Sequence, residues 1–116
     1  AKGKGSVQIA PALTKAIAYI DENYMKQPGL ESISKAAGVS SQHLCRLFRQ
    51  TLNCRPMEYI AKRKIQAAKM LLAETQKTVD QIAEETGFCD SSYFCKIFKR
   101  FESITPSQFR SIERAL

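Results

Sequence analysis

The sequence has 116 residues, which suits one compact domain and is too short for two independent ones. The 18 Lys and Arg residues exceed the 11 Asp and Glu residues and give a net charge of +7, so a polyanionic partner is favoured, either a nucleic acid or an anionic membrane surface. No apolar run reaches the roughly 18 residues of a membrane span, and no apolar stretch of a secretory signal follows the basic first residues. We therefore expect a folded domain that neither crosses a membrane nor is secreted.

Residues 1–8 are rich in Gly and Lys and lack a hydrophobic period, so they predict a linker or a remnant of cloning. From Pro11 onward, apolar residues recur at i, i+3, i+4 and i+7, which predicts an amphipathic helix. This helix ends before Pro28 and Gly29, which together break the chain. Its apolar stripe consists of Leu13, Ala16, Ile17, Ile20 and Tyr24.

A short helix is predicted over 30–37, and Gly38 ends it because glycine adopts the left-handed conformation without a steric penalty. The hydroxyl of Ser40 or Ser41 can then cap a further helix, which ends before Asn53. A short helix, a tight turn with glycine and a second helix have the outline of a helix-turn-helix unit.

The second half of the sequence continues the helical pattern. Pro56 suits a first helical turn and opens the longest predicted helix, over 56–73. We find no period-2 strand pattern of useful length, so we predict an all-α fold with about seven helices. The later boundaries are a capping box at Thr78 and Gln81, a stop at Gly87, a cap at Asp90 or Ser91, and a last start at Thr105 and Pro106.

The cysteines do not indicate a metal site or a disulfide framework. They contain no Cys-x-x-Cys pair, and the sequence has a single histidine, so closely spaced zinc ligands are lacking. We expect reduced thiols in a cytoplasmic protein without a metal or cofactor. The four cysteines are Cys45, Cys54, Cys89 and Cys95.

An internal repeat is the most informative feature of the sequence. Residues 44–50 (LCRLFRQ) recur as residues 94–100 (FCKIFKR), and every position but the last keeps its chemical type. The chain therefore contains one helix-turn-helix unit twice. We expect a first module over 9–55, a long linker helix over 56–73 and a second module over 74–116, which together form one compact domain.

The second helix of each unit has one apolar and one basic face. At 100° per residue, the apolar faces hold Leu44, Leu47, Phe48 and Thr51 in the first copy and Phe94, Ile97, Phe98 and Phe101 in the second. The opposite faces carry four positive charges and no acid, whereas a face that is only solvated usually mixes both signs. These outward faces consist of Gln42, Cys45, Arg46 and Arg49, and of Ser92, Cys95, Lys96 and Lys99.

The length of the linker helix permits both outward faces to meet one DNA duplex. A helix over 56–73 is roughly 27 Å long. Successive major grooves on one side of B-DNA are about 34 Å apart, and the half-width of each unit adds to the helix length. The two outward helices can therefore enter adjacent major grooves.

The sequence also resembles a known family. The segments 87–99 and 105–110 are similar to the signature of AraC/XylS-type transcription regulators, and 38–48 and 56–72 match the upstream half of the same pattern. The resemblance implies a seven-helix DNA-binding unit with two modules. In such regulators it usually follows an effector-sensing or dimerisation domain, for which this chain has no room, and RNA polymerase is a further candidate partner.

Four positions depart from the family pattern. Asn53 and Ser103 stand where the family usually has Gly, so the turn at Ser103 is expected to be slightly strained. Arg55 occupies the place that Thr105 takes in the repeat, so the long helix lacks a hydroxyl cap. Lys64 occupies a place where Arg is common.

Two sets of residues are candidates for DNA contact. Similar proteins use the places of Arg46 and Lys96 to reach base edges, and arginine can bond guanine O6 and N7 together. The candidates for base contact are Gln42, Cys45, Arg46, Ser91, Ser92, Cys95 and Lys96. The candidates for phosphate contact are Ser40, Ser41, Arg49, Lys99 and Arg100.

The sequence thus favours sequence-specific binding of double-stranded DNA for transcription regulation. The alternative is a basic helical module that binds an acidic protein without reading DNA sequence. An enzyme is disfavoured because the sequence shows no nucleophile–base pair, paired carboxylates near the histidine, or phosphate-binding glycine loop. Binding to a membrane surface would need an exposed apolar face beside the basic ones, which the pattern lacks.

Overall fold

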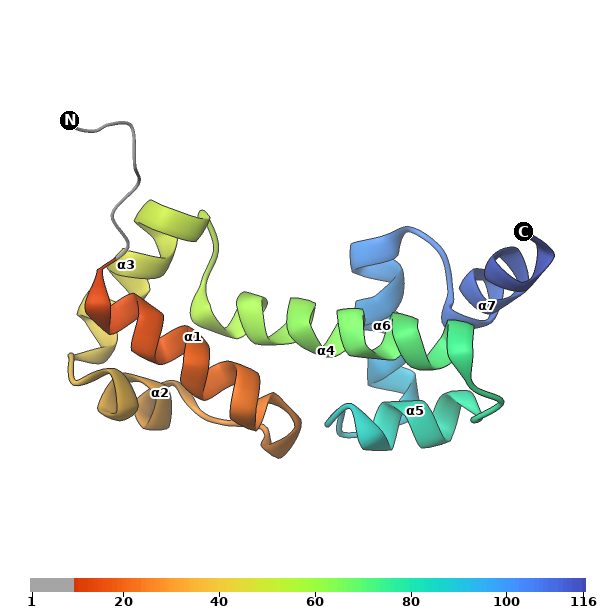
Figure 1. Ribbon diagram of the computed structural model, residues 1–116, viewed down its shortest axis with the longest axis horizontal. Helices are drawn as coiled ribbons and strands as arrows, with labels where there is room; N and C mark the ends of the chain where they lie inside the picture. Colours follow the sequence, from red (N-terminus) through yellow and green to blue (C-terminus); the bar gives the residue numbers. More distant parts are fainter. Residues whose placement is uncertain (1–9) are drawn as a thin grey trace.

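The structure is a computed structural model that describes residues 10–116, and within them it is all-helical, as predicted. The linker expected over 1–8 lies outside the described residues. Figure 1 shows three helices at each end of the long helix α4. The elements are α1 (Pro11–Asn23), the 3-10 helix η1 (Tyr24–Lys26), α2 (Leu30–Ala37), α3 (Ser41–Leu52), α4 (Pro56–Glu74), α5 (Val79–Glu85), α6 (Ser91–Glu102) and α7 (Pro106–Ala115).

Side-chain caps explain why the helices begin where they do. Ser40 caps α3, because its hydroxyl accepts from the backbone N–H of His43 at 3.1 Å. Asp90 caps α6 in the same way, and its carboxylate accepts from Tyr93 N at 2.7 Å. The predicted capping box of Thr78 at α5 is also present. Of the two candidates for each cap, the structure thus selects Ser40 and Asp90.

The start of α4 lacks a hydroxyl cap, as the sequence predicts. Instead, the side chain of Glu58 accepts from the backbone N–H of Arg55 at 3.1 Å.

The break between α1 and α2 contains η1, which the sequence pattern does not reveal, and Gln27 in the left-handed conformation at φ 53°. No helix within residues 10–116 is both long enough and apolar enough to span a membrane.

The buried residues form two hydrophobic cores, and α4 contributes to both. Ile60 belongs to the first core, whereas Ile65, Ala68 and Leu72 belong to the second. The first core is completed by Leu13, Ala16, Ile20, Ile33, Ala37, Leu44, Phe48 and Cys54. The second is completed by Ile82, Ala83, Phe88, Phe94, Ile97 and Phe98. We refer to α1–α3 as the N-terminal group and to α5–α7 as the C-terminal group.

One residue predicted for the apolar face of its helix is exposed. Thr51 lies in the last turn of α3 and faces solvent, whereas Leu44 and Phe48 on the same face are fully buried. In the same last turn Leu52 packs against the first core, so the packed side at this end of α3 is that of Leu52 and not that of Thr51.

The turn after α6 offers a test of backbone strain. Ser103 has φ 70°, in the left-handed region that disfavours most L-residues. We expect Ser103→Gly to raise the free energy of unfolding by about 0.5–1 kcal/mol, measured by urea denaturation, because glycine relieves this strain. Ser103→Ala is the control, since alanine keeps the strain. A stabilisation by both variants would show that the conformation is not the cause.

Candidate nucleic-acid interface

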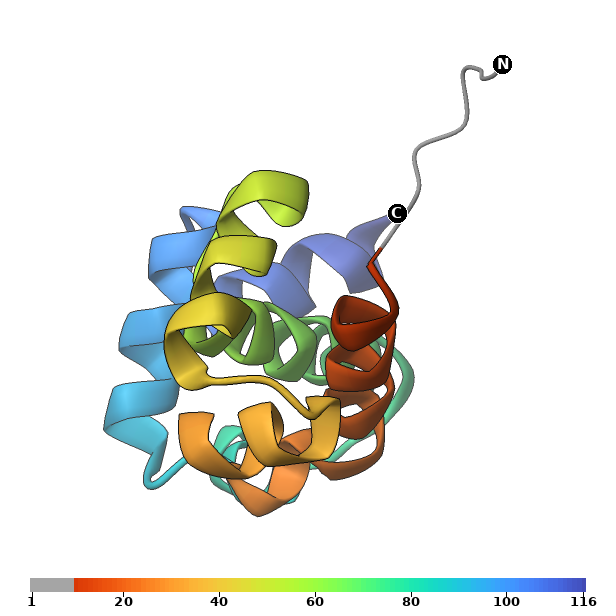
Figure 2. The same cartoon turned by 90° about the vertical axis from the view of Figure 1, so that its left-hand side faces the viewer.

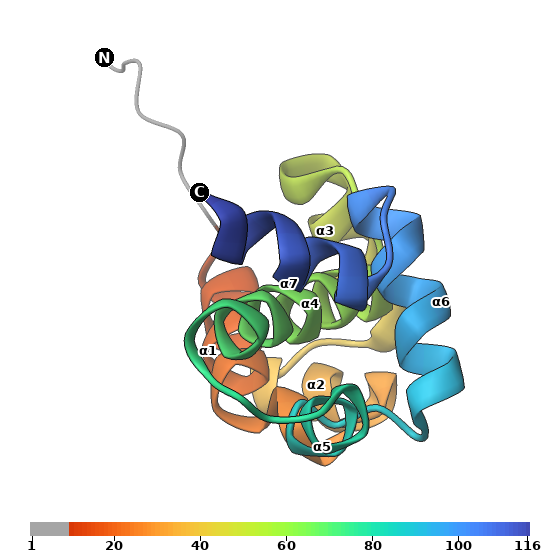
Figure 3. The ribbon, with the colours of Figure 1, turned by 90° about the vertical axis from the view of Figure 1, so that its right-hand side faces the viewer.

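Helices α3 and α6 lie on the same side of α4. Figure 2 and Figure 3 view the molecule from its two ends, and in both α3 and α6 lie on the side opposite to α1. The two helices rise in the same direction across α4. The 19 residues of α4 make it about 28 Å long. The repeated helices are thus presented on the same side of one shared helix.

The outward face of α3, which we call the first stripe, is accessible as expected. Gln42, Arg46 and Arg49 are exposed, and Cys45 between them is half-buried. A hollow of about 430 Å³ lies along this face, lined by Leu30, Ser41 and the residues of the stripe. The first stripe consists of Gln42, Cys45, Arg46 and Arg49.

The outward face of α6, the second stripe, is equally basic. Lys96 and Lys99 are exposed, and so is the neighbouring Arg100. Cys95 is half-buried and packs against the second core, and this burial raises the pKa of its thiol. A protonated thiol is a weak hydrogen-bond donor, so Cys95 offers apolar contact more than polarity. The second stripe consists of Ser92, Cys95, Lys96 and Lys99.

The candidate serine residues lie just before or at the starts of α3 and α6, and they differ in exposure and in hydrogen bonding. Ser40 accepts from the backbone of α3, so its own O–H remains available to donate. Ser41 is half-buried, and its Oγ lies 3.2 Å from Oγ of Ser34 in α2. Ser91 is half-buried at the start of α6, and Ser92 is exposed. Of these four, Ser40 and Ser92 are the most accessible.

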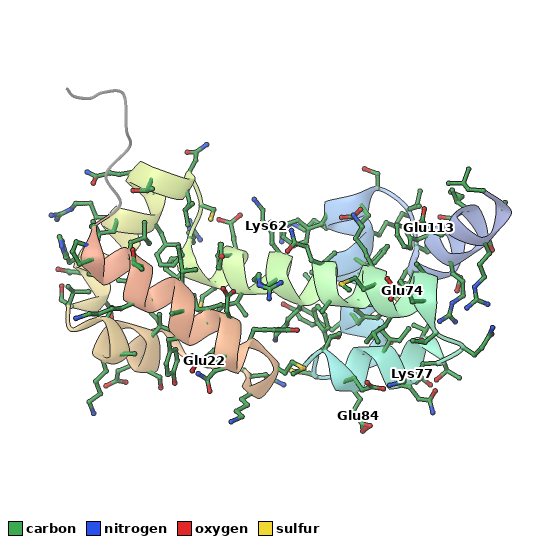
Figure 4. The ribbon with its side chains drawn as sticks, viewed as in Figure 1. Glu22, Lys62, Glu74, Lys77, Glu84 and Glu113 are labelled. Atoms are coloured by element: carbon green, nitrogen blue, oxygen red, sulfur yellow. The ribbon has the colours of Figure 1, made fainter. Side chains whose placement is uncertain are left out.

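The acids that form ion pairs within the described residues are bonded to cations outside both stripes. The three ion pairs among the described residues use Arg63, Lys69 and Lys77, and none uses a cation of either stripe. Glu102, at the end of α6, is held by Lys69 of α4 at 3.0 Å. Within the described residues the four stripe cations form no ion pair, so each can bind an external anion. Figure 4 labels other acids on α1, α4, α5 and α7, namely Glu22, Glu74, Glu84 and Glu113.

A second hollow lies between the start of α4 and α6, and the sequence did not reveal it. Two arginines line it, Arg55 and Arg100, together with Tyr93, whose side chain is 49% exposed. Glu58 also lines the hollow. Arg100 was a sequence candidate, whereas Arg55 and Tyr93 were not. The one available signal was the replacement of a capping threonine by Arg55 in the repeat.

The described residues hold no group of three His, Cys, Asp or Glu side chains that could bind a metal ion. The candidate site is an exposed cationic surface on a pair of repeated helices.

Residues 33–112 match a family described as a helix-turn-helix domain. The chain belongs to this AraC/XylS-type family. The resemblance seen in the sequence is therefore confirmed.

Members of the helix-turn-helix family with known roles or structures resemble the chain over most of its length. This chain is 30% identical over 95 residues to the lactose operon transcription activator of Staphylococcus xylosus. The matched region covers 82% of this chain and 34% of the activator. An AraC-type transcriptional regulator from Chromobacterium violaceum has 30% identity and a TM-score of 0.84, covering 89% of this chain and 92% of that structure. The DNA-binding domain of AdpA, solved with a target DNA, has 24% identity and a TM-score of 0.84, with 91% and 96% covered, and shows likeness of fold.

The chain described here spans about a third of the length of the curated relatives that it matches.

Proposed function

We propose that this chain binds specific sequences in double-stranded DNA and thereby regulates transcription, with α3 and α6 in adjacent major grooves. The observation that carries the proposal is the pair of exposed, acid-free cationic stripes on repeated helices at the same side of α4. Membership in the helix-turn-helix family supports DNA as the partner. It does not favour the alternative of a basic module that binds an acidic protein.

The proposal assigns base contacts to the first half of α3 and of α6. Arg46 presents a planar guanidinium that can bond guanine O6 and N7 together, and Gln42 can pair with adenine N6 and N7. Lys96 can serve the same acceptors as Arg46 with less geometric definition. Cys45 and Cys95 are half-buried and offer contact to a thymine methyl group or a sugar. Ser91 and Ser92 complete the proposed set.

Phosphate contacts are assigned to the edges of the stripes. Such contacts fix register and orientation without reading sequence. Arg49 and Lys99 lie one turn beyond the proposed reading residues, and the hydroxyl of Ser40 lies at the start of α3, where backbone N–H groups favour anions. The complete proposed set is Ser40, Ser41, Arg49, Lys99 and Arg100.

The division into two reading units with a linker is part of the same proposal. The modules over 9–55 and 74–116 would each read one groove, and the helix over 56–73 would set their separation. Ile60 lies in one core and Ile65 in the other, which supports two units that are joined through α4. The chain itself would have no enzymatic role. We further propose that an effector or dimerisation domain lies outside this chain and that RNA polymerase is a partner.

A footprinting experiment tests whether both modules engage DNA. If α3 and α6 enter adjacent grooves about 10 base pairs apart, the protected region on a selected site should extend over about 17–20 base pairs. The sites are first selected from random duplexes, and hydroxyl-radical cleavage then maps the protection. Protection of a single groove would show that one module alone reads DNA. Enrichment of no sequence would contradict specific recognition altogether, since specific binding exceeds nonspecific binding by roughly 10³-fold or more.

A further inference from the structure

The N-terminal and C-terminal groups touch directly, apart from their common attachment to α4. In Figure 1, the segment after α1 approaches the turn between α5 and α6. Gly87 in this turn has φ +86°, and a Cβ atom built on it would lie 2.6 Å from the backbone oxygen of Met25 and 2.8 Å from its Cα. Two backbones therefore meet at a distance that only glycine permits. We call this contact and the side chains around it the seam; it comprises Met25, Gln27, Lys64, Gly87 and Cys89.

Side chains reinforce the seam from both sides. The ammonium of Lys64, in α4, donates to the backbone oxygen of Gly87 at 2.8 Å and lies 5.2 Å from the ring centroid of Phe88. Burial lowers the pKa of Lys64. The thiol of Cys89 donates to Oε1 of Gln27 at 3.7 Å. The turn that leads into α6 is thus held both by α4 and by the N-terminal group.

The N-terminal side of the seam is itself fixed to α4. Arg63 lies over the ring of Tyr24 at 4.9 Å, and its Nε donates to Asp21 at 2.9 Å. Arg63 and Lys64 fall between Ile60, in the first core, and Ile65, in the second. This part of α4 therefore joins the two cores, and each of these side chains anchors one side of the seam.

A second attachment changes what α4 alone can fix. A single helix sets the distance between its two ends but can bend and twist along its length. When the two groups also touch at the seam, their rotation about α4 is fixed as well. The rotation matters because one base pair moves a groove by about 3.4 Å along the axis and by about a tenth of a turn around it.

We propose that the seam determines which spacing between two half-sites the protein accepts. The inference rests on the proposed function and deepens it: α3 and α6 read base edges, and the seam sets the register between the two readings. Gly87 and Lys64 are positioning residues in this scheme, since neither belongs to a stripe. A protein with an intact seam should bind one spacing much more tightly than the others. A protein whose seam is disrupted by a substitution should lose this preference.

The test compares two glycine variants. Gly87→Ala places a methyl group against the backbone of Met25, whereas Gly38→Ala adds the same left-handed strain at φ +76° with no atom within 4 Å. Each protein is titrated against duplexes that carry both selected half-sites at centre-to-centre spacings of about 9, 10, 11 and 12 base pairs. We expect the wild type and Gly38→Ala to prefer one spacing by about tenfold or more, and Gly87→Ala to lose or shift that preference.

Each outcome has one meaning. Equal spacing profiles for Gly87→Ala and Gly38→Ala would overturn the role of the seam, while a wild type without any selected site would overturn the proposed function. Circular dichroism monitors folding. If Gly87→Ala does not fold, Lys64→Met replaces it, with Lys64→Arg as the conservative variant. We then expect Lys64→Met to flatten the spacing profile and Lys64→Arg to preserve it, because arginine can still donate to the oxygen of Gly87. A preserved profile in Lys64→Met would contradict the inference.

Discussion

Replacing Arg46 with alanine is expected to remove the preference for one or two base pairs of the binding site, at a cost of about 1–3 kcal/mol of discrimination. Arg46 lies in the middle of the first stripe, its side chain is exposed, and it forms no ion pair within the described residues. In the proposed complex its guanidinium would therefore bond a base edge without first breaking an ion pair within the protein. The measurement is the affinity for a selected duplex and for each of its single-base-pair variants.

Lys99→Ala is the matched control for this experiment, since Lys99 lies at the edge of the second stripe. We expect it to weaken binding to all sequences alike and to reduce the slope of log affinity against log salt by about one, as one phosphate contact is lost. An equal loss on every sequence for Arg46→Ala would refute its assignment to base contact and would place it with the phosphate residues.

Replacing Phe98 with alanine is expected to lower the free energy of unfolding by about 3–5 kcal/mol. The ring of Phe98 is fully buried, and its centroid lies 5.8 Å from that of Phe94 and 5.6 Å from that of Phe109. Truncation leaves a cavity beside rings of α6 and α7, and these packed helices cannot readily close it. Urea denaturation monitored by circular dichroism measures the loss.

Two further variants show how far this effect extends. Phe48 takes the place of Phe98 in the repeat but belongs to the first core, so Phe48→Ala should cause a similar loss. Phe101 is half-buried at the edge of the second core, so Phe101→Ala should cost less. Hydrogen exchange is expected to show that Phe98→Ala weakens protection first in α5 and α6. A loss below about 1 kcal/mol for Phe98→Ala would mean that the ring is not part of a tightly packed core.

The local features of the fold could be predicted because they depend on residues close together in the chain. The cap at Ser40 and the capping box at Thr78 each involve a side chain and a backbone group within one helical turn. The left-handed ends at Asn53 and Ser103 are conformations of single residues, whose backbone N–H groups bond carbonyls four residues earlier. The break before α2 was located, but η1 was missed because a single 3-10 turn carries no hydrophobic period.

The candidate site was predicted in part. The repeat and the 3.6-residue period placed Arg46 and Lys96 on exposed faces, as the structure has them. Periodicity alone did not show that Thr51 is exposed while Leu52 beside it packs against the first core, or that Cys95 packs against the second core. Such differences depend on where the neighbouring helices lie, which a pattern within one helix does not contain.

The sequence by itself determined the helices, most of their boundaries and the two basic faces, since these follow from interactions over a few residues. It also showed the duplication, through the recurrence of residues 44–50 as residues 94–100. The tertiary structure alone decided that both faces lie on one side of α4 and that the backbone of Met25 meets Gly87. The contact between Lys64 and the oxygen of Gly87 spans 23 residues. It depends on the packing of two cores around a shared helix, and no periodicity in the chain encodes that packing.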